Sequence, residues 1–175
     1  VVRGQPNYGC DFGVNVWGGH AGVTSHVDEV REDFTAMAGI GLNVVRWFVF
    51  TDGRGGIRWD PARRLGGLAD GFFEDMDAAL GLARNAGVQL CLVLFDYTWM
   101  LHHEEHDAEG KRLFATQPEW LATADGLARI LEAVIDPMLA RYGTSGSHAS
   151  LGRSIHSIDV INEPDWVTQG FAVGR

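Results

Sequence analysis

Residues 88–95, VQLCLVLF, decide the fold class of this 175-residue chain. Every residue in this stretch except Gln89 is apolar. A strand with an almost continuous apolar run is covered on both faces, which is typical of a parallel sheet. Similar short runs lie at 12–17 (FGVNVW), 43–50 (NVVRWFVF) and 155–161 (IHSIDVI). We therefore predict four strands.

Helical periodicity fills the segments between these strands. Ser25, followed three residues later by Asp28, resembles a capping box that starts a helix. Asp70 and Gly87 are expected to bound a second helix, and Pro137 is expected to kink or split a third. The three apolar stripes are Val27, Val30, Phe34 and Met37; Phe73, Met76, Leu80 and Ala83; and Leu127, Ile130, Leu131, Val134, Met138 and Tyr142.

The predicted order is therefore an alternation of strands and helices without hairpin signals, which indicates an α/β fold with a parallel sheet. Two architectures compete, an open doubly wound sheet and a (β/α)8 TIM barrel. An open dinucleotide-binding sheet would need a G-x-G-x-x-G turn after its first strand, and residues 16–20 (VWGGH) lack that spacing. A barrel predicts functional side chains at the carboxyl ends of several strands.

Composition excludes several classes of partner. The chain has 14 Lys and Arg against 23 Asp and Glu, a formal net charge of −9, so nucleic acid is not an expected partner. No apolar stretch reaches the roughly 18 residues that cross a bilayer, so no membrane association is expected. No charged-then-apolar leader is visible, and localisation stays undecided from the residues alone.

No cofactor and no metal are expected either. Cys10 and Cys91 are too few for a disulfide framework, and we expect both to be free thiols. Residues 102–106 (HHEEH) do not match the zinc-protease pattern H-E-x-x-H, because a second histidine follows His102. We expect this segment to be a solvated loop.

Polar and aromatic side chains mark all four predicted strand ends. They are Asn15 and Trp17; Arg46 and Trp47; Asp96 and Trp99; and Asn162, Glu163 and Trp166. A tryptophan at a strand end needs a partner for its indole N–H, so a purely structural role is a poor explanation for four of them. Sugar rings offer apolar faces for stacking and hydroxyl groups for hydrogen bonds. We predict that these residues bind an oligosaccharide or polysaccharide, although strand ends also collect aromatic residues under their loops.

Glu163 is the candidate catalytic residue. It follows an apolar strand directly, and Pro164 disfavours right-handed helical geometry at Glu163, so we expect extended backbone there. Partial burial beside aromatic rings favours the protonated form of a carboxyl group, which would suit Glu163 to donate a proton near neutral pH. The alternative is an ordinary surface glutamate in a turn.

These residues carry a resemblance to a known family. The NEP tripeptide at 162–164, FGVN at 12–15 and NVVRW at 43–47 resemble clan A of the retaining glycoside hydrolases, most closely its cellulase and β-mannanase family. Enzymes of that clan are (β/α)8 barrels. The resemblance implies a β-linked glucan or mannan as substrate, and secretion is common among such enzymes.

The resemblance also implies roles for three residues. Glu163 would be the general acid/base, Asn162 would bind the sugar 2-hydroxyl, and Arg46 would orient the carboxylate of the nucleophile. In that clan the nucleophile is a second glutamate, which ends strand seven. Retaining hydrolysis needs two carboxyl groups about 5–5.5 Å apart.

Only one of the two carboxyl groups is present among the predicted strand ends. A complete barrel has about 250 residues. We therefore expect residues 1–175 to be the N-terminal half of one (β/α)8 catalytic domain, with about four strands and three helices, and to be inactive alone. A non-catalytic carbohydrate-binding half-barrel is the alternative. A Schiff-base lyase or isomerase is disfavoured, because the only lysine is Lys111.

A half-barrel leaves strand edges and an apolar face without partners, which favours association. We therefore predict that the isolated chain dimerises or aggregates. Light scattering at tens of micromolar protein measures this, and a compact monomer would contradict the prediction.

Overall fold

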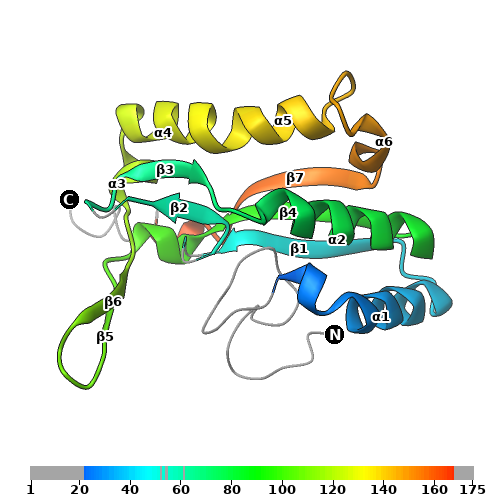
Figure 1. Cartoon of the computed structure of the whole chain (residues 1–175), viewed down its shortest axis with the longest axis horizontal. Coiled ribbons are helices and arrows are strands. Elements are labelled where there is room, and N and C mark those ends of the chain that lie inside the picture. Colours follow the sequence, from blue (N-terminus) through cyan, green and yellow to red (C-terminus); the bar gives the residue numbers. More distant parts are fainter. Residues whose placement is uncertain (1–21, 52, 54, 61, 168–175) are drawn as a thin grey trace.

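The structure, a computed structural model, describes residues 22–51, 53, 55–60 and 62–167. Its centre is a parallel sheet of three strands in the order β1-β4-β7 (Figure 1). The strands are β1 (Val44–Thr51), β4 (Gln89–Asp96) and β7 (Ile155–Asn162). They agree with three predicted ranges to within one residue. The predicted strand at 12–17 lies outside the described residues.

The central strand, β4, is paired on both edges and is buried over most of its length. The register aligns Trp47 with Leu92 and then Leu92 with Ile158, so these side chains lie on one face of the sheet. The same register pairs Asp96 with Asn162 at the carboxyl ends of β4 and β7. Polar residues that end different strands are therefore neighbours.

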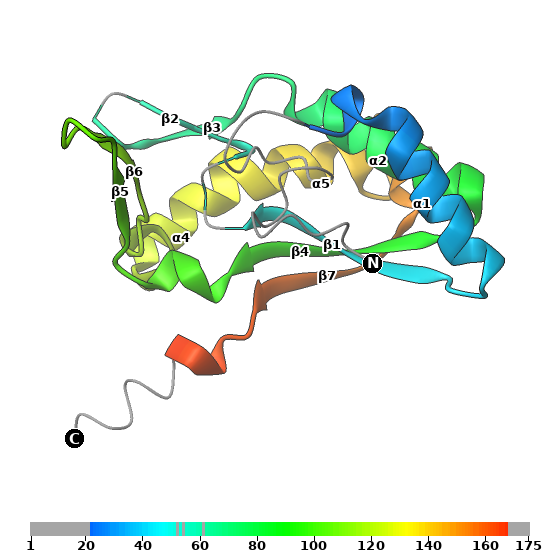
Figure 2. The ribbon, with the colours of Figure 1, turned by 90° about the horizontal axis from the view of Figure 1, so that it is seen from below.

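The long helices lie on one side of the sheet (Figure 2). They are α1 (Val27–Gly39), α2 (Phe72–Ala86), and a composite of α4 (Ala124–Ile130), η3 (Leu131–Ile135) and α5 (Asp136–Tyr142). Shorter helical segments are η1 (Val23–Ser25), η2 (Tyr97–Met100), α3 (Glu119–Ala122) and α6 (Ala149–Gly152). No helix in the described ranges is long and apolar enough to span a bilayer.

The start of α1 differs from the predicted capping box. The N-cap residue is His26, and it makes no side-chain capping hydrogen bond. Ser25 belongs instead to the short 3-10 turn η1. The neighbouring Thr24 anchors this turn to α2, since its backbone N and its Oγ1 both donate to Asp75 Oδ1, at 2.8 and 2.6 Å.

Pro137 interrupts the third helix, as predicted. A proline has no N–H to donate and its ring clashes with the carbonyl group four residues earlier, here that of Ala133. The chain widens to a π-helical turn at η3, and α5 then begins at Asp136 with Pro137 in its first turn. The helix therefore continues past the proline.

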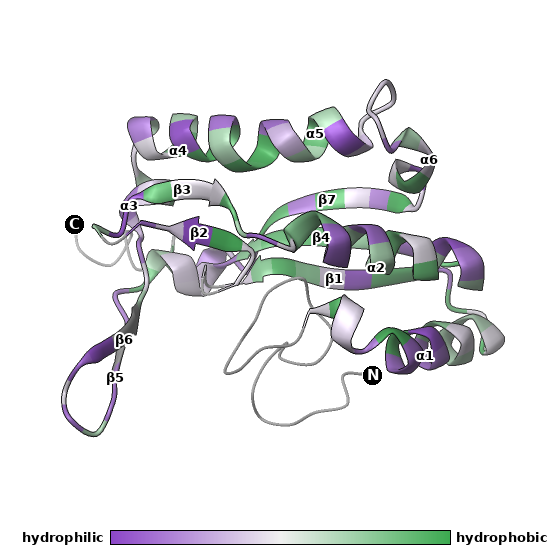
Figure 3. Ribbon diagram, viewed as in Figure 1, coloured by the Kyte–Doolittle hydropathy of each residue, from purple (hydrophilic) through white to green (hydrophobic). Residues whose placement is uncertain are grey.

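The expected absence of hairpins is wrong. Two small antiparallel pairs form in the loops, β2 (Ile57–Trp59) with β3 (Leu65–Leu68), and β5 (Glu104–His106) with β6 (Arg112–Ala115). Aspartates close both turns: Asp60 accepts from the backbone N of Arg64 at 2.8 Å, and Asp107 accepts from that of Lys111 at 2.7 Å. The β5–β6 pair extends from the body and is largely hydrophilic (Figures 1 and 3).

Some large apolar side chains stay exposed on β7 and on the composite helix. Ile158 and Val160 are 46% and 62% exposed, and Leu127, Leu131 and Leu139 are about half exposed. Within the described part of the chain, β7 is paired only with β4. These exposed residues favour self-association, which stays a prediction.

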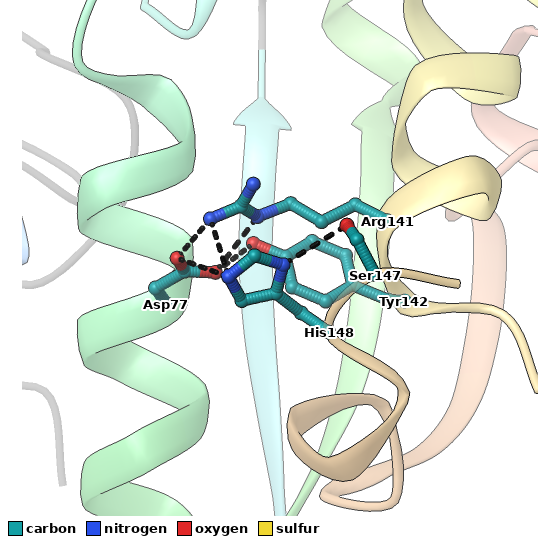
Figure 4. A network of polar contacts seen from close by, with 5 residues as sticks. All are labelled: Asp77, Arg141, Tyr142, Ser147 and His148. Carbon is teal, nitrogen blue, oxygen red and sulfur yellow. Dashed lines mark hydrogen bonds and ion pairs between the residues drawn. The ribbon is translucent and has the colours of Figure 1, made fainter.

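A polar cluster joins α2 to α5 on the helix side of the sheet (Figure 4). Arg141 Nε donates to Asp77 Oδ1 at 3.0 Å, Arg141 Nη2 donates to Oδ2, and the Tyr142 hydroxyl donates to Oδ1 at 2.7 Å. His148 lies 3.1 Å from Arg141 Nη2. Burial alone would raise the pKa of Asp77, but the hydrogen bonds from Arg141 and Tyr142 and the charge of Arg141 lower that pKa overall. Burial and the nearby Asp77 carboxylate raise the pKa of Tyr142.

Asp77→Asn should lower the free energy of unfolding at neutral pH by roughly 1–3 kcal/mol, because charged hydrogen bonds are lost. The pKa of Asp77 is lower in the folded chain than in the unfolded chain, where it is about 3.9. The stabilisation is thus present above that value and is lost as pH falls through the folded pKa. Urea unfolding of both proteins from neutral to acid pH should show the difference shrinking below about pH 4.

The control is Asp70→Asn, which removes a fully exposed carboxylate 3.9 Å from Arg58. It should change the unfolding free energy little at any pH. A deficit of Asp77→Asn that stays constant down to acid pH would contradict the electrostatic explanation.

Candidate active site

Side chains that are far apart in the sequence meet on the three parallel strands, where Arg46, the third residue of β1 and not its last as predicted, reaches toward Asp159 and Asn162 in the second half of β7. Arg46 Nη2 donates to Asp159 Oδ2 at 2.6 Å and to Asn162 Oδ1 at 3.1 Å. Asn162 Nδ2 in turn donates to Asp96 Oδ2 at 2.8 Å, and Thr98 N donates to Asp96 Oδ1 at 3.1 Å. We call Asp159, Arg46, Asn162 and Asp96 the strand-end network. Three predicted binding residues, Arg46, Asn162 and Asp96, therefore lie in one contact chain.

The network fixes the amide of Asn162 at both ends. Its oxygen accepts from Arg46 and its nitrogen donates to Asp96. An amide nitrogen carries two protons, so one proton of Asn162 Nδ2 is left for a further acceptor. The orientation of that second proton is set by the same two contacts.

Charge is unevenly distributed and unevenly buried in the network. One guanidinium group is associated with two carboxylates, directly with Asp159 and through Asn162 with Asp96. Asp96 is only 8% exposed, whereas the side chain of Arg46 is about half exposed. The buried end is therefore the rigid end, and the exposed end is accessible to a ligand.

Glu163 directly follows the network, but its backbone and its surroundings differ from the expectation. Its φ is +49°, so it lies in the left-handed region and not in extended backbone. A turn follows β7, in which Trp166 N donates to Glu163 O at 3.2 Å. The side chain is exposed, so the expected partial burial is absent. A non-glycine residue in this conformation carries roughly 1–3 kcal/mol of strain, which is a feature of functional sites.

The tryptophans separate into exposed and core residues. Trp166 is 68% exposed and stacks on Tyr97, with ring centroids 6.1 Å apart. Trp47 and Trp99 are 6% and 1% exposed, so neither offers a ring face to a sugar here. Trp47 projects onto the helix side and contacts Phe34. This arrangement corrects the stacking prediction for Trp47 and Trp99.

Two predicted binding residues, Asn15 and Trp17, lie outside the described residues. Two further residues reach the site: Tyr97, which the sequence also places at the end of the third predicted strand, and Asp159, which the sequence analysis does not indicate. Tyr97 supports Trp166, and its position directly after Asp96 is the signal for it. Asp159 contacts Arg46, and its signal is that it is the one carboxylate in residues 155–162 (IHSIDVIN).

Metal-ligating residues do not gather in the described ranges. No group of three or more His, Cys, Asp or Glu side chains there is arranged to hold a metal ion. Cys91 is a free thiol, and Cys10 lies outside these ranges.

By sequence, no protein-family model matches the chain, and no curated protein matches it either. By structure, the chain is similar to β-mannanases. The β-mannanase of the blue mussel Mytilus edulis has a TM-score of 0.63 at 19% identity, over 90% of this chain and 38% of that one. The β-1,4-D-mannanase of Cryptopygus antarcticus has a TM-score of 0.62 at 18% sequence identity, over 87% of this chain and 39% of that one. The β-1,4-mannanase of the sea hare Aplysia kurodai has a TM-score of 0.61 at 13% sequence identity, over 81% of this chain and 36% of that one.

These similarities show a shared fold. At such low identity they do not transfer residue roles. The chain spans less than two fifths of the length of these β-mannanases.

Asp96→Asn tests whether the network is held together at its buried end. Both carboxylate oxygens of Asp96 accept from N–H donors, Asn162 Nδ2 and Thr98 N. An asparagine has one oxygen, so its amide nitrogen would face one of these donors. We expect the free energy of unfolding to fall by roughly 1–3 kcal/mol, measured by urea unfolding.

Asp165→Asn, at an exposed position near the same end of β7, is the control and should leave the unfolding free energy nearly unchanged. Equal stability of both variants would mean that Asp96 does not hold the network.

Proposed function

We propose that this chain carries the acid/base side of the active site of a retaining glycoside hydrolase that cleaves a β-linked polysaccharide, with mannan as the preferred class and glucan as the second. Residues 1–175 would form the first four strands of a (β/α)8 domain. The observation that carries the proposal is the strand-end network, which places an oriented Asn162 directly before Glu163 at the carboxyl end of the sheet. The similarity in fold to β-mannanases supports mannan.

In this proposal Glu163 protonates the glycosidic oxygen as the bond to the anomeric carbon breaks. A carboxylate outside this set of strands attacks that carbon and forms a glycosyl-enzyme intermediate. Glu163, now deprotonated, accepts a proton from the water that releases the sugar. Its exposed position leaves it within reach of a polymer chain.

Two residues of the network would act beside Glu163. The second proton of Asn162 Nδ2 would donate to the sugar 2-hydroxyl, a contact that strengthens in the transition state. Arg46 would hold the attacking carboxylate, since charge-assisted hydrogen bonds from a guanidinium group orient such a group well. Trp166, stacked on Tyr97, would support a sugar ring beyond the cleavage point.

Glu163→Gln in the complete enzyme should lower turnover of mannan by about 100- to 10,000-fold, because proton transfer to a poor leaving group is lost. Aryl β-mannosides with acidic phenols leave without full protonation, so the loss of glycosyl transfer on them should be much smaller. Steady-state and burst kinetics on both substrate types measure this difference. Asp165→Asn is the matched control and should retain turnover.

Equal losses on both substrate types would contradict the acid role of Glu163. Absence of hydrolysis by the unaltered enzyme on mannan and on glucan would contradict the proposed function.

A non-catalytic carbohydrate-binding role is the second candidate, and the exposed Trp166 ring on Tyr97 favours it. Tryptophan fluorescence of the 175-residue chain titrated with mannooligosaccharides distinguishes the two roles. Binding that Trp166→Ala abolishes, without hydrolysis in any form of the protein, would favour the binding role. No response up to millimolar sugar would exclude it.

A further inference from the structure

We propose that Asp159 is a positioning residue, which sets the orientation of the Arg46 guanidinium group from the opposite edge of the sheet. The inference rests on the proposed function for its effect on catalysis. Its geometric part concerns this chain alone.

The contact spans the central strand. Arg46 lies on β1 and Asp159 on β7, and the only strand between them is β4. The register aligns Phe48 with Val93 and Val93 with Asp159, so Asp159 projects from the same face as Phe48 and Arg46. The guanidinium group crosses β4 on this face to reach a carboxylate 113 positions later in the sequence. The face is the one opposite Trp47, which contacts helix α1.

The two contacts of Arg46 fix its plane. Both go through Nη2, to Asp159 Oδ2 at 2.6 Å and to Asn162 Oδ1 at 3.1 Å. Nη2 has two protons in the rigid plane of the guanidinium group, so two acceptors determine the direction of that plane. No hydrogen bond within the described residues engages Nη1 or Nε of Arg46. These donors are left for a second carboxylate, with their direction already set.

Stability does not explain the pair. The two side chains are 51% and 36% exposed, and exposed ion pairs contribute little to the stability of a fold. Aspartate is also disfavoured in strands. The carboxylate of Asp159 inside β7 is therefore better explained by its contact with Arg46 than by a contribution to the stability of the fold. The Arg46 guanidinium carbon also lies 5.5 Å from the Phe48 ring centroid, and this contact restricts the guanidinium group on one side.

Asp159→Asn tests the positioning role, because the shape is kept and the charge is removed. In the complete enzyme, kcat on mannan should fall roughly 10- to 100-fold, as expected when a catalytic group is misplaced by about an ångström. KM should stay within about twofold, since Asp159 is not expected to touch the sugar. The melting temperature should not change measurably. Asp159→Glu restores the carboxylate and should recover part of kcat.

Asp28→Asn is the matched control, since it removes an exposed carboxylate that pairs with Arg31 on α1. It should leave kcat, KM and melting temperature unchanged. A kcat of Asp159→Asn within twofold of the unaltered enzyme would overturn the proposal. A loss of kcat that Asp159→Glu does not recover, together with a lower melting temperature, would mean that Asp159 has only a structural role. This result would also overturn the proposal.

An activity-independent measurement separates this proposal from the proposed function. NMR of the complete protein with labelled arginine side chains reports rotation of each guanidinium group, and Arg46→Lys assigns the signals of Arg46. Restricted rotation in the unaltered chain that becomes free in Asp159→Asn supports positioning. Unchanged rotation overturns it. Absence of any glycosidase activity would defeat the proposed function and leave this measurement to decide the geometric claim.

Discussion

Pairing of β4 between two parallel strands is the constraint on which the rest of the structure depends. β4 is paired on both edges, and its sequence is apolar and buried over most of its length. Parallel pairing then makes all three strands end at the same edge. Asp96 and Asn162 meet only because their strands are in register. The network at this edge is thus a consequence of backbone pairing, with its contacts refined by the side chains.

Much of this arrangement could be predicted from the sequence, since the relevant signals are local. The apolar runs locate β1, β4 and β7 to within a residue, and Pro137 marks the irregular helix turn. The hairpins in the loops could not be predicted, because each is only three or four residues per strand and depends on aspartate contacts in its turn. The start of α1 was missed for a similar reason, as Thr24 binds α2 and draws the chain away from the expected cap.

The candidate site was only partly predictable. Residue types at strand ends indicated Arg46, Asp96 and Asn162, and these three do meet. Whether a tryptophan beside them is a sugar platform or a core residue depends on which face of the sheet it occupies, and Trp47 occupies the helix side. The partner of Arg46 is set by strand order across the sheet, which no local pattern reveals. Asp159 can contact Arg46 only because β7 pairs with β4.

The left-handed backbone at Glu163 has a consequence for how the chain can change over generations. Glycine is the one residue for which this conformation carries no steric cost, so every other side chain there is retained against a standing preference for glycine. Under the proposed function, the requirement for the carboxyl group is what would keep glutamate at this position. In a descendant that had lost the proposed activity, Glu163 would be among the first residues to be substituted, most readily by glycine. Under the proposed function, the residue at position 163 would therefore indicate whether the site is still in use.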